Sequence, residues 1–254
     1  SNLVDPKRGK LPLLDFPQFV VERFGVFAIE PLNDHFPSTQ PDYLAQLRDS
    51  LTAHKVRIAN IATGLGGSLY DPNALKRQKV LERAQHWIDV AQAVGSPSIR
   101  LHLEGTKRLK TDVATTVASL GNLARYGQKK QVVIHLENDS PTTEDAFLLG
   151  KIIKEVDTPW VRALPDFGNA MAQNKGESFN YESVEEMFRY AFGICHVKDS
   201  LRVNKKVYRF DLERTLEIAI AAKFAGYYSI EYDEGGDAEV PTKRLIEATA
   251  KAIS

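Results

Sequence analysis

Four short apolar segments in the second half of the chain each end in a side chain that can bind a metal ion. The segments are residues 132–137, 161–166, 193–196 and 228–231, and their last residues are Glu137, Asp166, His196 and Glu231. Successive terminal residues are 29, 30 and 35 positions apart, about one strand and one helix each. In a parallel barrel the carboxyl ends of the strands lie at one mouth. The spacing therefore predicts an α/β barrel with these four side chains gathered at that mouth.

Strand-like and helix-like segments alternate along the rest of the chain as well. Helices are expected at residues 16–24, 41–53, 71–94, 111–127, 143–156, 183–190, 211–225 and 240–253. Further strands are expected at residues 26–30, 55–62 and 99–103. No linker or low-complexity tract interrupts this order, and 254 residues is a typical length for one α/β barrel. We therefore predict a single domain over residues 1–254, with α/β architecture and a (β/α)8-type barrel.

The sequence gives the least support for the first strand of such a barrel. Seven segments have convincing strand patterns, and the only further candidate, residues 11–14, contains Pro12. Proline is a poor residue for a central strand because it cannot donate a ladder hydrogen bond. Either this segment completes the barrel, or the true first strand lies upstream of Ser1. We favour the second interpretation, in which the first strand is weak or missing in this chain.

Composition and charge narrow the range of partners. Lys and Arg number 33 and are balanced by 33 Asp and Glu, so there is no net charge to attract nucleic acid or a membrane surface. No apolar run approaches the roughly 18 residues of a membrane span. Cys195 is the only cysteine, which excludes an internal disulfide and does not reveal the compartment. No signal peptide is visible, so a cytoplasmic location is the default expectation. Because the chain begins at Ser1 without Met, an exported form from which a signal peptide was trimmed stays open.

Side-chain alternation along the strands predicts which polar residues face the barrel interior. If the terminal ligands point inward, His135 on the strand of Glu137 also points inward. On the strand expected at residues 99–103, Arg100 and His102 share the inward face. The residues expected at the mouth are Glu30, Asn60, His102, Glu137, Asp166, His196 and Glu231. Burying one uncompensated polar group costs roughly 2–7 kcal/mol, and a charge costs more. A divalent cation would offset the repulsion between the carboxylates, and one His with three carboxylates suits Mn²⁺, Mg²⁺, Co²⁺ or Zn²⁺.

An ordered set of motifs at these strand ends resembles a known family. The motifs are Glu137-Asn138, Asp166-Phe167-Gly168-Asn169, His196-Val197-Lys198-Asp199 and Glu231. In order and placement they resemble the sugar phosphate isomerase/epimerase group of the xylose isomerase-like TIM barrel superfamily. The resemblance implies that Glu137, Asp166, His196 and Glu231 hold one divalent metal ion. It also implies that Glu137 and Glu231 move the substrate proton.

The resemblance also suggests which residues contact the substrate. Ketose epimerases of the group carry an Arg six residues after the metal-binding His, and Arg202 stands at that position. Their Asp-x-x-His motif reads Asp-x-x-Asn here, so Asn169 replaces a substrate-contacting His. Together with the other polar residues of the mouth, the expected substrate contacts are Glu30, Asn60, His102, Asn169, Lys198 and Arg202.

The implied reaction is isomerisation or epimerisation of a sugar, sugar derivative or polyol. The metal ion would polarise the carbonyl of an open-chain sugar and stabilise an enediolate. Glu137 and Glu231 would act as base and acid, while Lys198, Arg202 or His102 would neutralise the developing oxyanion. No clear phosphate-binding motif is present, which favours an unphosphorylated substrate.

Three other interpretations of the chain stay open. A metal-dependent lyase or dehydratase, or a hydrolase, would use the same scaffold, and a sugar-binding barrel would perform no catalysis. Apurinic endonucleases share the barrel, but they need additional metal-binding histidines, one of them at the position of Asn169. The absence of this histidine and the neutral net charge argue against a role in DNA repair.

The sequence does not determine the oligomeric state. Dimers and tetramers are common among such barrels, so a homo-oligomer is compatible with the sequence.

Overall fold

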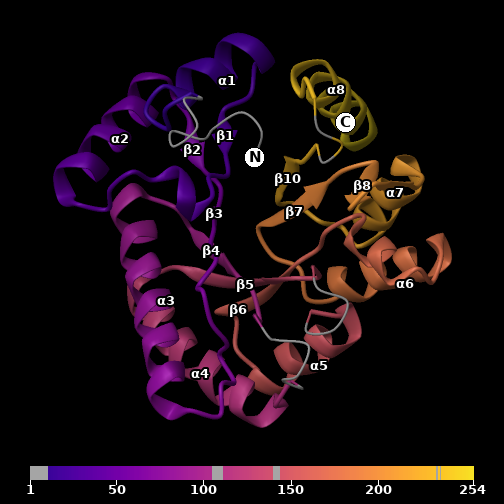
Figure 1. The fold of residues 1–254 in the computed structure, drawn as a ribbon. Helices are drawn as coiled ribbons and strands as arrows, with labels where there is room; N and C mark the ends of the chain where they lie inside the picture. The colour runs from indigo at the N-terminus through magenta and orange to yellow at the C-terminus, as the bar shows by residue number, and fades with distance from the viewer. Residues whose placement is uncertain (1–10, 105–110, 140–143, 233, 235) are drawn as a thin grey trace.

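Eight α-helices surround a set of mainly parallel strands in the described part of the chain (Figure 1). In this computed structural model, the described residues are 11–104, 111–139, 144–232, 234 and 236–254. The helices are α1 (Phe16–Phe24), α2 (Pro41–Ala53), α3 (Ala74–Val94), α4 (Val113–Lys130), α5 (Ala146–Val156), α6 (Glu177–Phe188), α7 (Leu212–Ala221) and α8 (Glu239–Ile253). The strands are β1 (Ala28–Ile29), β2 (Arg57–Ile58), β3 (Ile61–Ala62), β4 (Ser98–Leu101), β5 (Val133–Glu137), β6 (Val161–Leu164), β7 (Ile194–Val197), β8 (Ser200–Val203), β9 (Lys206–Arg209) and β10 (Tyr227–Ile230).

Parallel pairing follows the order of the chain, as a barrel of strand–helix units requires. β1 pairs with β2, β3 to β6 form one ladder, and β7 pairs with β10, all in parallel. Single parallel bridges, Ala163 with Ala191 and Asp166 with His196, connect the edge of β6 to the segment of β7. The predicted α/β fold is therefore confirmed, with strands β2 and β3 together occupying the one strand expected at residues 55–62.

The barrel has a seam between its last and first strands. Within the described residues, no strand pairing joins β10 to β1. The doubtful segment at residues 11–14 does not fill this position, because it forms a turn that leads directly into α1. Consistent with this arrangement, the side chains of β10 are half-buried or exposed, whereas all those of β4 and β5 are buried.

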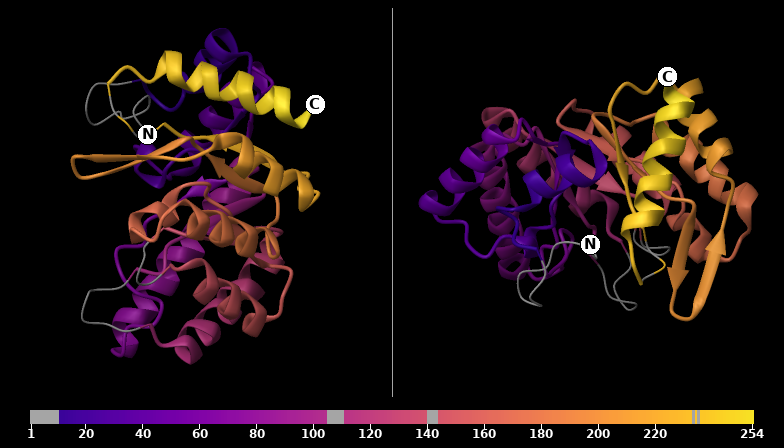
Figure 2. Two further views of the ribbon diagram at one scale, coloured as in Figure 1. Left: turned by 90° about the vertical axis from the view of Figure 1, so that its right-hand side faces the viewer. Right: turned by 90° about the horizontal axis from the view of Figure 1, so that it is seen from above.

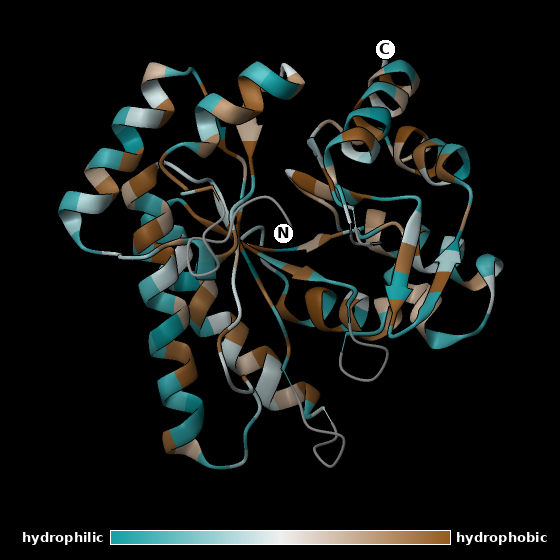
Figure 3. Ribbon diagram, turned by 45° about the horizontal axis from the view of Figure 1, so that its top comes forward, coloured by the Kyte–Doolittle hydropathy of each residue, from teal (hydrophilic) through white to brown (hydrophobic). Residues whose placement is uncertain are grey.

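Apolar residues that recur with a period of two along the strands and of about 3.6 along the helices produce the core. Outward residues of the central strands, such as Ile99, Ile134 and Leu136, pack in one cluster with helix residues such as Ile88 and Leu120. Inward residues Ala59, Leu164 and Ile194 form a separate small cluster inside the barrel, with Ala28 against it. The central strands are mostly hydrophobic, and the surrounding helices carry hydrophilic residues (Figure 3). None of the described helices is long and apolar enough to cross a membrane.

Several boundaries differ from the sequence-based expectations. Helix α6 begins at Glu177, earlier than the expected residue 183, directly after Gly176 with its φ of 89°. Helix α7 ends at Ala221 rather than residue 225, and Lys223 then adopts a left-handed φ of 54°. The expected start of α5 at Thr143 lies outside the described residues. The antiparallel hairpin of β8 and β9, which was not expected, extends from the body of the molecule between β7 and α7 (Figure 2).

Candidate metal centre

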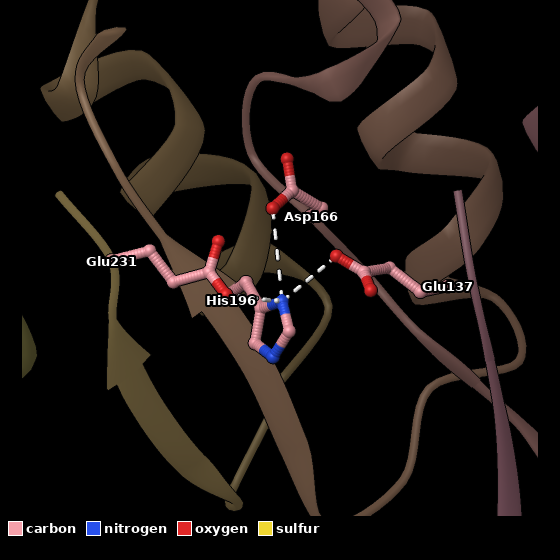
Figure 4. Close-up of side chains that lie close together, drawn as sticks. All are labelled: Glu137, Asp166, His196 and Glu231. Carbon is pink, nitrogen blue, oxygen red and sulfur yellow. Dashed lines mark hydrogen bonds and ion pairs between the residues drawn. The ribbon is translucent and has the colours of Figure 1, made fainter. Parts of the chain in front are cut away.

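Four side chains from four different strands meet at the carboxyl end of the barrel (Figure 4). Glu137 is the last residue of β5, Asp166 follows β6, His196 lies in β7, and Glu231 directly follows β10. One ligand atom from each lies within 4.8 Å of all the others. His196 Nδ1 faces this group, 2.8 Å from Glu137 Oε1, 3.3 Å from Glu231 Oε1 and 3.8 Å from Asp166 Oδ2. The structure thus brings together the four residues that the sequence suggested as metal ligands.

The turn after β6 orients Asp166. Asp166 Oδ1 accepts hydrogen bonds from the backbone N–H groups of Gly168 and Asn169, at 2.8 and 2.7 Å. Asn138, the residue after Glu137, holds the same turn from the neighbouring strand. Its side chain accepts a hydrogen bond from Asp166 N at 2.8 Å and donates one to Asp166 O at 3.1 Å. These bonds occupy Oδ1 and the backbone, and they leave Oδ2 directed at the cluster.

Lys198 and Asn169 contact the cluster directly. Lys198 is 2% exposed, and its Nζ lies 2.8 Å from Asp166 Oδ2 and 2.7 Å from Glu231 Oε2. Lys198 also donates a hydrogen bond to Asn169 Oδ1 at 3.3 Å, and Asn169 Nδ2 donates one to Glu137 Oε1 at 3.2 Å. Both residues were predicted to bind substrate, and in the structure they hold the carboxylates of the cluster.

A second chain of polar contacts reaches Glu137 from β4. Arg100 Nε lies 3.0 Å from Glu137 Oε2, and the Arg100 guanidinium contacts His102 Nε2. His102 Nδ1 lies 3.1 Å from Glu144 Oε1, which also accepts a hydrogen bond from the backbone of Leu103. Strand alternation indicated that Arg100 faces inward, but it was not among the predicted site residues. Glu144 was also not among the predicted site residues: the sequence placed it in the first turn of the helix expected at 143–156, whereas it precedes α5 and is buried.

Glu30 and Asn60, two further predicted substrate contacts, lie on the other side of His196. Glu30 accepts hydrogen bonds from Ser229 Oγ at 2.6 Å and Asn60 Nδ2 at 2.8 Å, and its Oε2 lies 3.0 Å from His196 Nε2. Asn60 is fully buried, and its Oδ1 accepts a hydrogen bond from Ser98 Oγ. Both polar ends of Asn60 are therefore engaged within the protein.

Arg202 is the one predicted site residue that the structure does not bring to the cluster. It lies on β8 with an exposed side chain, pairing along the backbone with Val207 of β9. No contact among the described residues joins its guanidinium to the four clustered side chains.

The charges of the site leave room for a divalent cation. Among the described residues, the carboxylates of Glu30, Glu137, Asp166 and Glu231 lie near two permanently charged cations, Arg100 and Lys198. Glu137 and Asp166 are buried, whereas the side chains of Glu30 and Glu231 are 8% and 32% exposed. A divalent ion would offset the excess of negative charge among these side chains, and its preference for carboxylate oxygen and imidazole nitrogen matches the donor set. The residues present therefore fit a divalent metal ion.

The charges and the burial of the clustered side chains also shift their pKa values. Burial lowers the pKa of His196, but the carboxylates of Glu231, Glu30 and Glu137 raise it well above its usual value. Burial raises the pKa of Asp166 to about 7 despite the opposing charge of Lys198. Burial also works to raise the pKa of Glu137, yet the charges of His196 and Arg100 hold it below the usual range. Protons on His196 and Asp166 would therefore partly replace a metal ion when none is bound.

A cavity of about 570 Å³ lies along the seam and reaches the cluster. Glu30, Ser229 and Glu231 line its inner part. Its outer walls are mostly apolar and come from α1, β1, β10 and α8, for example Val20, Tyr228 and Ile246. Small-molecule sites commonly enclose 300–1,000 Å³ with a few polar groups on apolar walls. The cavity is thus large enough for a small ligand to reach Glu231.

Comparison with known proteins agrees with this architecture. A family model described as xylose isomerase-like TIM barrel matches residues 20–252. No curated protein matches the chain. The fold is similar to that of the 3-keto-D-glucoside 4-epimerase YcjR from E. coli, at 14% identity and a TM-score of 0.74 over 94% of each chain. It is also similar to a D-psicose 3-epimerase crystallised with D-fructose (14%, TM-score 0.72, 96% of this chain and 92% of that one). A third similar structure is IolI with a bound zinc atom (14%, TM-score 0.74, 94% and 91%).

Proposed function

Because the chain belongs to the xylose isomerase-like TIM barrel family, we propose that it is a divalent-metal-dependent isomerase or epimerase. Its proposed substrate is a sugar, a sugar derivative or a polyol. The sugar epimerases among the structurally similar proteins support this reaction class, and the zinc atom bound by IolI supports the metal dependence. Glu137, Asp166, His196 and Glu231 would hold the metal ion.

One observation carries the proposal: two glutamates from separate strands lie in one cluster in which negative side chains outnumber the permanently positive ones. Glu137 and Glu231 come from separate strands, and both lie within 3.3 Å of the same nitrogen of His196. A bound divalent cation would polarise a substrate carbonyl and offset the negative charge that develops on its oxygen. Carboxylates in such positions can exchange a proton with the carbon beside that carbonyl.

The neighbouring residues keep the two glutamates ionised. Arg100 pairs with Glu137, and Lys198 pairs with Glu231 at 2.7 Å. Burial raises the pKa of Glu231, but the charges of His196 and Lys198 lower it below its usual value. In the proposed reaction one glutamate takes the proton from the carbon while the electron pair moves to the carbonyl oxygen. The same glutamate then returns this proton to carbon, or the other glutamate delivers a proton that it has taken from water, while the first releases its proton to solvent.

Solvent hydrogen exchange provides a direct test. The protein would be incubated with Mn²⁺ and a panel of ketoses, aldoses and keto-polyols in deuterated water, and the sugars would be followed by proton NMR. We expect deuterium at the carbon beside the carbonyl of at least one sugar. The variants Glu137→Gln and Glu231→Gln should slow this exchange by about 10²–10⁴-fold. A matched control is Glu155→Gln on α5, since Glu155 is 45% exposed and, among the described residues, pairs with Lys151 alone.

Other outcomes distinguish the remaining functions. Loss of water from a keto-polyol would indicate a dehydratase, and a cleaved product would indicate a lyase or hydrolase. Saturable sugar binding without any exchange would indicate a non-catalytic sugar-binding barrel. If Mn²⁺ does not bind to the wild-type protein at all, the metal-dependent reaction is wrong.

A further inference from the structure

The two ring nitrogens of His196 face two separate groups of acceptors. Nδ1 points to the cluster of Glu137, Asp166 and Glu231 (Figure 4). Nε2 lies 3.0 Å from Glu30 Oε2 and 3.1 Å from Glu30 Oε1. A neutral imidazole carries one protonated and one unprotonated nitrogen, and only the unprotonated nitrogen can bind a metal ion. The nitrogen that keeps its proton therefore decides whether His196 can serve as a ligand at this cluster.

Two hydrogen-bond donors, one for each carboxylate oxygen, hold Glu30 in place. Asn60, between β2 and β3, donates to Oε1 at 2.8 Å, and Ser229 of β10 donates to Oε2 at 2.6 Å. Asn60 is itself oriented by Ser98 of β4, whose hydroxyl lies 2.7 Å from Asn60 Oδ1. Because these partners come from different strands of the barrel, the Glu30 carboxylate is fixed relative to His196 by the sheet rather than by its own loop.

This arrangement disfavours a direct role for Glu30 in binding metal or substrate. Among the described residues, Glu30 does not belong to the group whose ligand atoms lie within 4.8 Å of one another. Its two oxygens already accept hydrogen bonds from Asn60, His196 and Ser229, and its side chain is only 8% exposed. A substrate hydroxyl could bind Glu30 only by displacing one of these partners.

We infer that Glu30 is the positioning residue of the proposed metal centre, accepting the Nε2 proton of His196 so that the unprotonated Nδ1 faces the metal. This inference rests on the metal site of the proposed function. A carboxylate behind a metal-binding histidine fixes the ring orientation and its tautomer and makes the ligand nitrogen more basic. Loss of such a partner typically weakens metal binding 10–100-fold. The sequence placed Glu30 among the substrate contacts, and this geometry assigns it a different role.

The test measures metal affinity without using activity. The Kd for Mn²⁺ would be determined by calorimetry for the wild-type protein, Glu30→Gln, Ser229→Ala and the control Glu104→Gln. Glu104 also lies just beyond a strand of the barrel, but it accepts hydrogen bonds from the backbone of Leu65 and Gly66. We expect a Kd about 10–100-fold higher in Glu30→Gln, a smaller increase in Ser229→Ala, and no change in Glu104→Gln.

A second measurement on the wild-type protein covers the case in which Glu30→Gln does not fold. Nitrogen-15 NMR of the histidine rings in the Zn²⁺-loaded protein reports which nitrogen of His196 is protonated. A proton on Nε2 with the metal on Nδ1 is expected, and metal on Nε2 would overturn the inference. An unchanged Mn²⁺ affinity in a folded Glu30→Gln would overturn it as well, while leaving the proposed function intact. If the wild-type protein binds no metal ion, the proposed function and this inference both fail.

Discussion

At the scale of single residues, the site is a buried network in which almost every charge has a defined partner. Glu137 has Arg100 on one oxygen and His196 on the other, at 3.0 and 2.8 Å. Lys198 joins Asp166 to Glu231. Removing one member of a buried ion pair leaves the other charge uncompensated, which typically costs about 3–5 kcal/mol. The cations of this site therefore affect folding as well as chemistry.

The ion pair of Arg100 with Glu137 leads to a prediction about stability. Both side chains are less than 10% exposed, so Arg100→Gln leaves Glu137 Oε2 buried without its cation. We expect this variant to lose about 3–5 kcal/mol in the free energy of unfolding, measured by urea denaturation at pH 7 in the presence of EDTA. The control is Arg209→Gln, since Arg209 pairs with Glu234 but is 64% exposed and should lose less than about 1 kcal/mol. Equal losses in the two variants would contradict the prediction.

The contact between His102 and Glu144 leads to a prediction about pH. Burial lowers the pKa of His102, but the hydrogen bond with Glu144 and the charges of Glu144 and Glu137 together raise it above the usual value. A raised folded-state pKa gives stabilisation that is complete below the unfolded pKa of about 6.5 and is lost as pH rises through the folded value. We expect Glu144→Gln to lower the His102 pKa in an NMR titration.

The same variant should change the pH dependence of stability. The deficit of Glu144→Gln relative to the wild-type protein should be larger at pH 6 than at pH 9, because His102 is charged only at the lower pH. His86 offers an internal control for the NMR titration, because it is exposed on α3 and contacts Thr39 rather than a carboxylate. A His102 titration curve that is identical in both proteins would show that Glu144 does not set its pKa.

At the scale of elements, each helix must approach its strand closely enough to place the strand end at the mouth. Helix α4 leads into β5, which carries Glu137, and the connection is tight: Val132 N donates to Gly127 O at 2.9 Å. A Cβ atom at Gly127 would lie 2.4 Å from Val132 O, closer than real atoms approach. Gly121, one and a half turns earlier in the same helix, has no such neighbour, since its nearest contact would be Arg125 Nη1 at 3.8 Å.

These two glycines should respond in opposite directions to the same substitution. Glycine inside a helix costs roughly 0.5–1 kcal/mol relative to alanine, so Gly121→Ala should stabilise the protein by about that amount. Gly127→Ala should instead destabilise it by about 1–3 kcal/mol, because α4 must move away from Val132. Urea denaturation of both variants checks the prediction. A stabilised Gly127→Ala protein would mean that α4 and β5 are less tightly joined than the structure shows.

At the scale of the whole molecule, the candidate site connects strands that lie far apart along the chain. Its four candidate ligands come from the ends of β5, β6, β7 and β10, and the last of these borders the seam beside β1. A metal ion bound there would link the ends of these four strands on one side of the seam. Any ligand that binds only the folded chain raises its free energy of unfolding by mass action.

Metal binding should therefore stabilise the entire barrel. At a free Mn²⁺ concentration of 100 times Kd, the free energy of unfolding should rise by about 2.7 kcal/mol. For a chain of this size that corresponds to a thermal midpoint roughly 5–10 °C higher than in EDTA. Asp166→Asn removes one ligand and should shift much less under the same conditions. Coincident thermal unfolding curves with EDTA and with excess Mn²⁺ would contradict the prediction.

Much of the architecture follows from local sequence patterns. The alternation of short apolar runs with amphipathic segments predicted seven barrel strands and eight helices, and the xylose isomerase-like barrel is confirmed. The four candidate ligand positions could be proposed from the sequence because each lies at or near the carboxyl end of a strand, and parallel strands place these ends at one mouth. Periodicity and strand ends are properties of consecutive residues, so the chain specifies them without reference to distant contacts.

Other features depended on which segments the folded chain brings together. The hairpin of residues 200–209 replaced an expected loop, and it carries Arg202 away from the cluster. Glu144 pairs with His102 across 42 positions of sequence, and Glu30 meets Ser229 across 199. Strand alternation predicts that Glu30 points inward, but not that Asn60 and Ser229 direct it toward His196. The direction and partner of a side chain at a strand end are set by the strands beside it, and only the tertiary structure determines which strands those are.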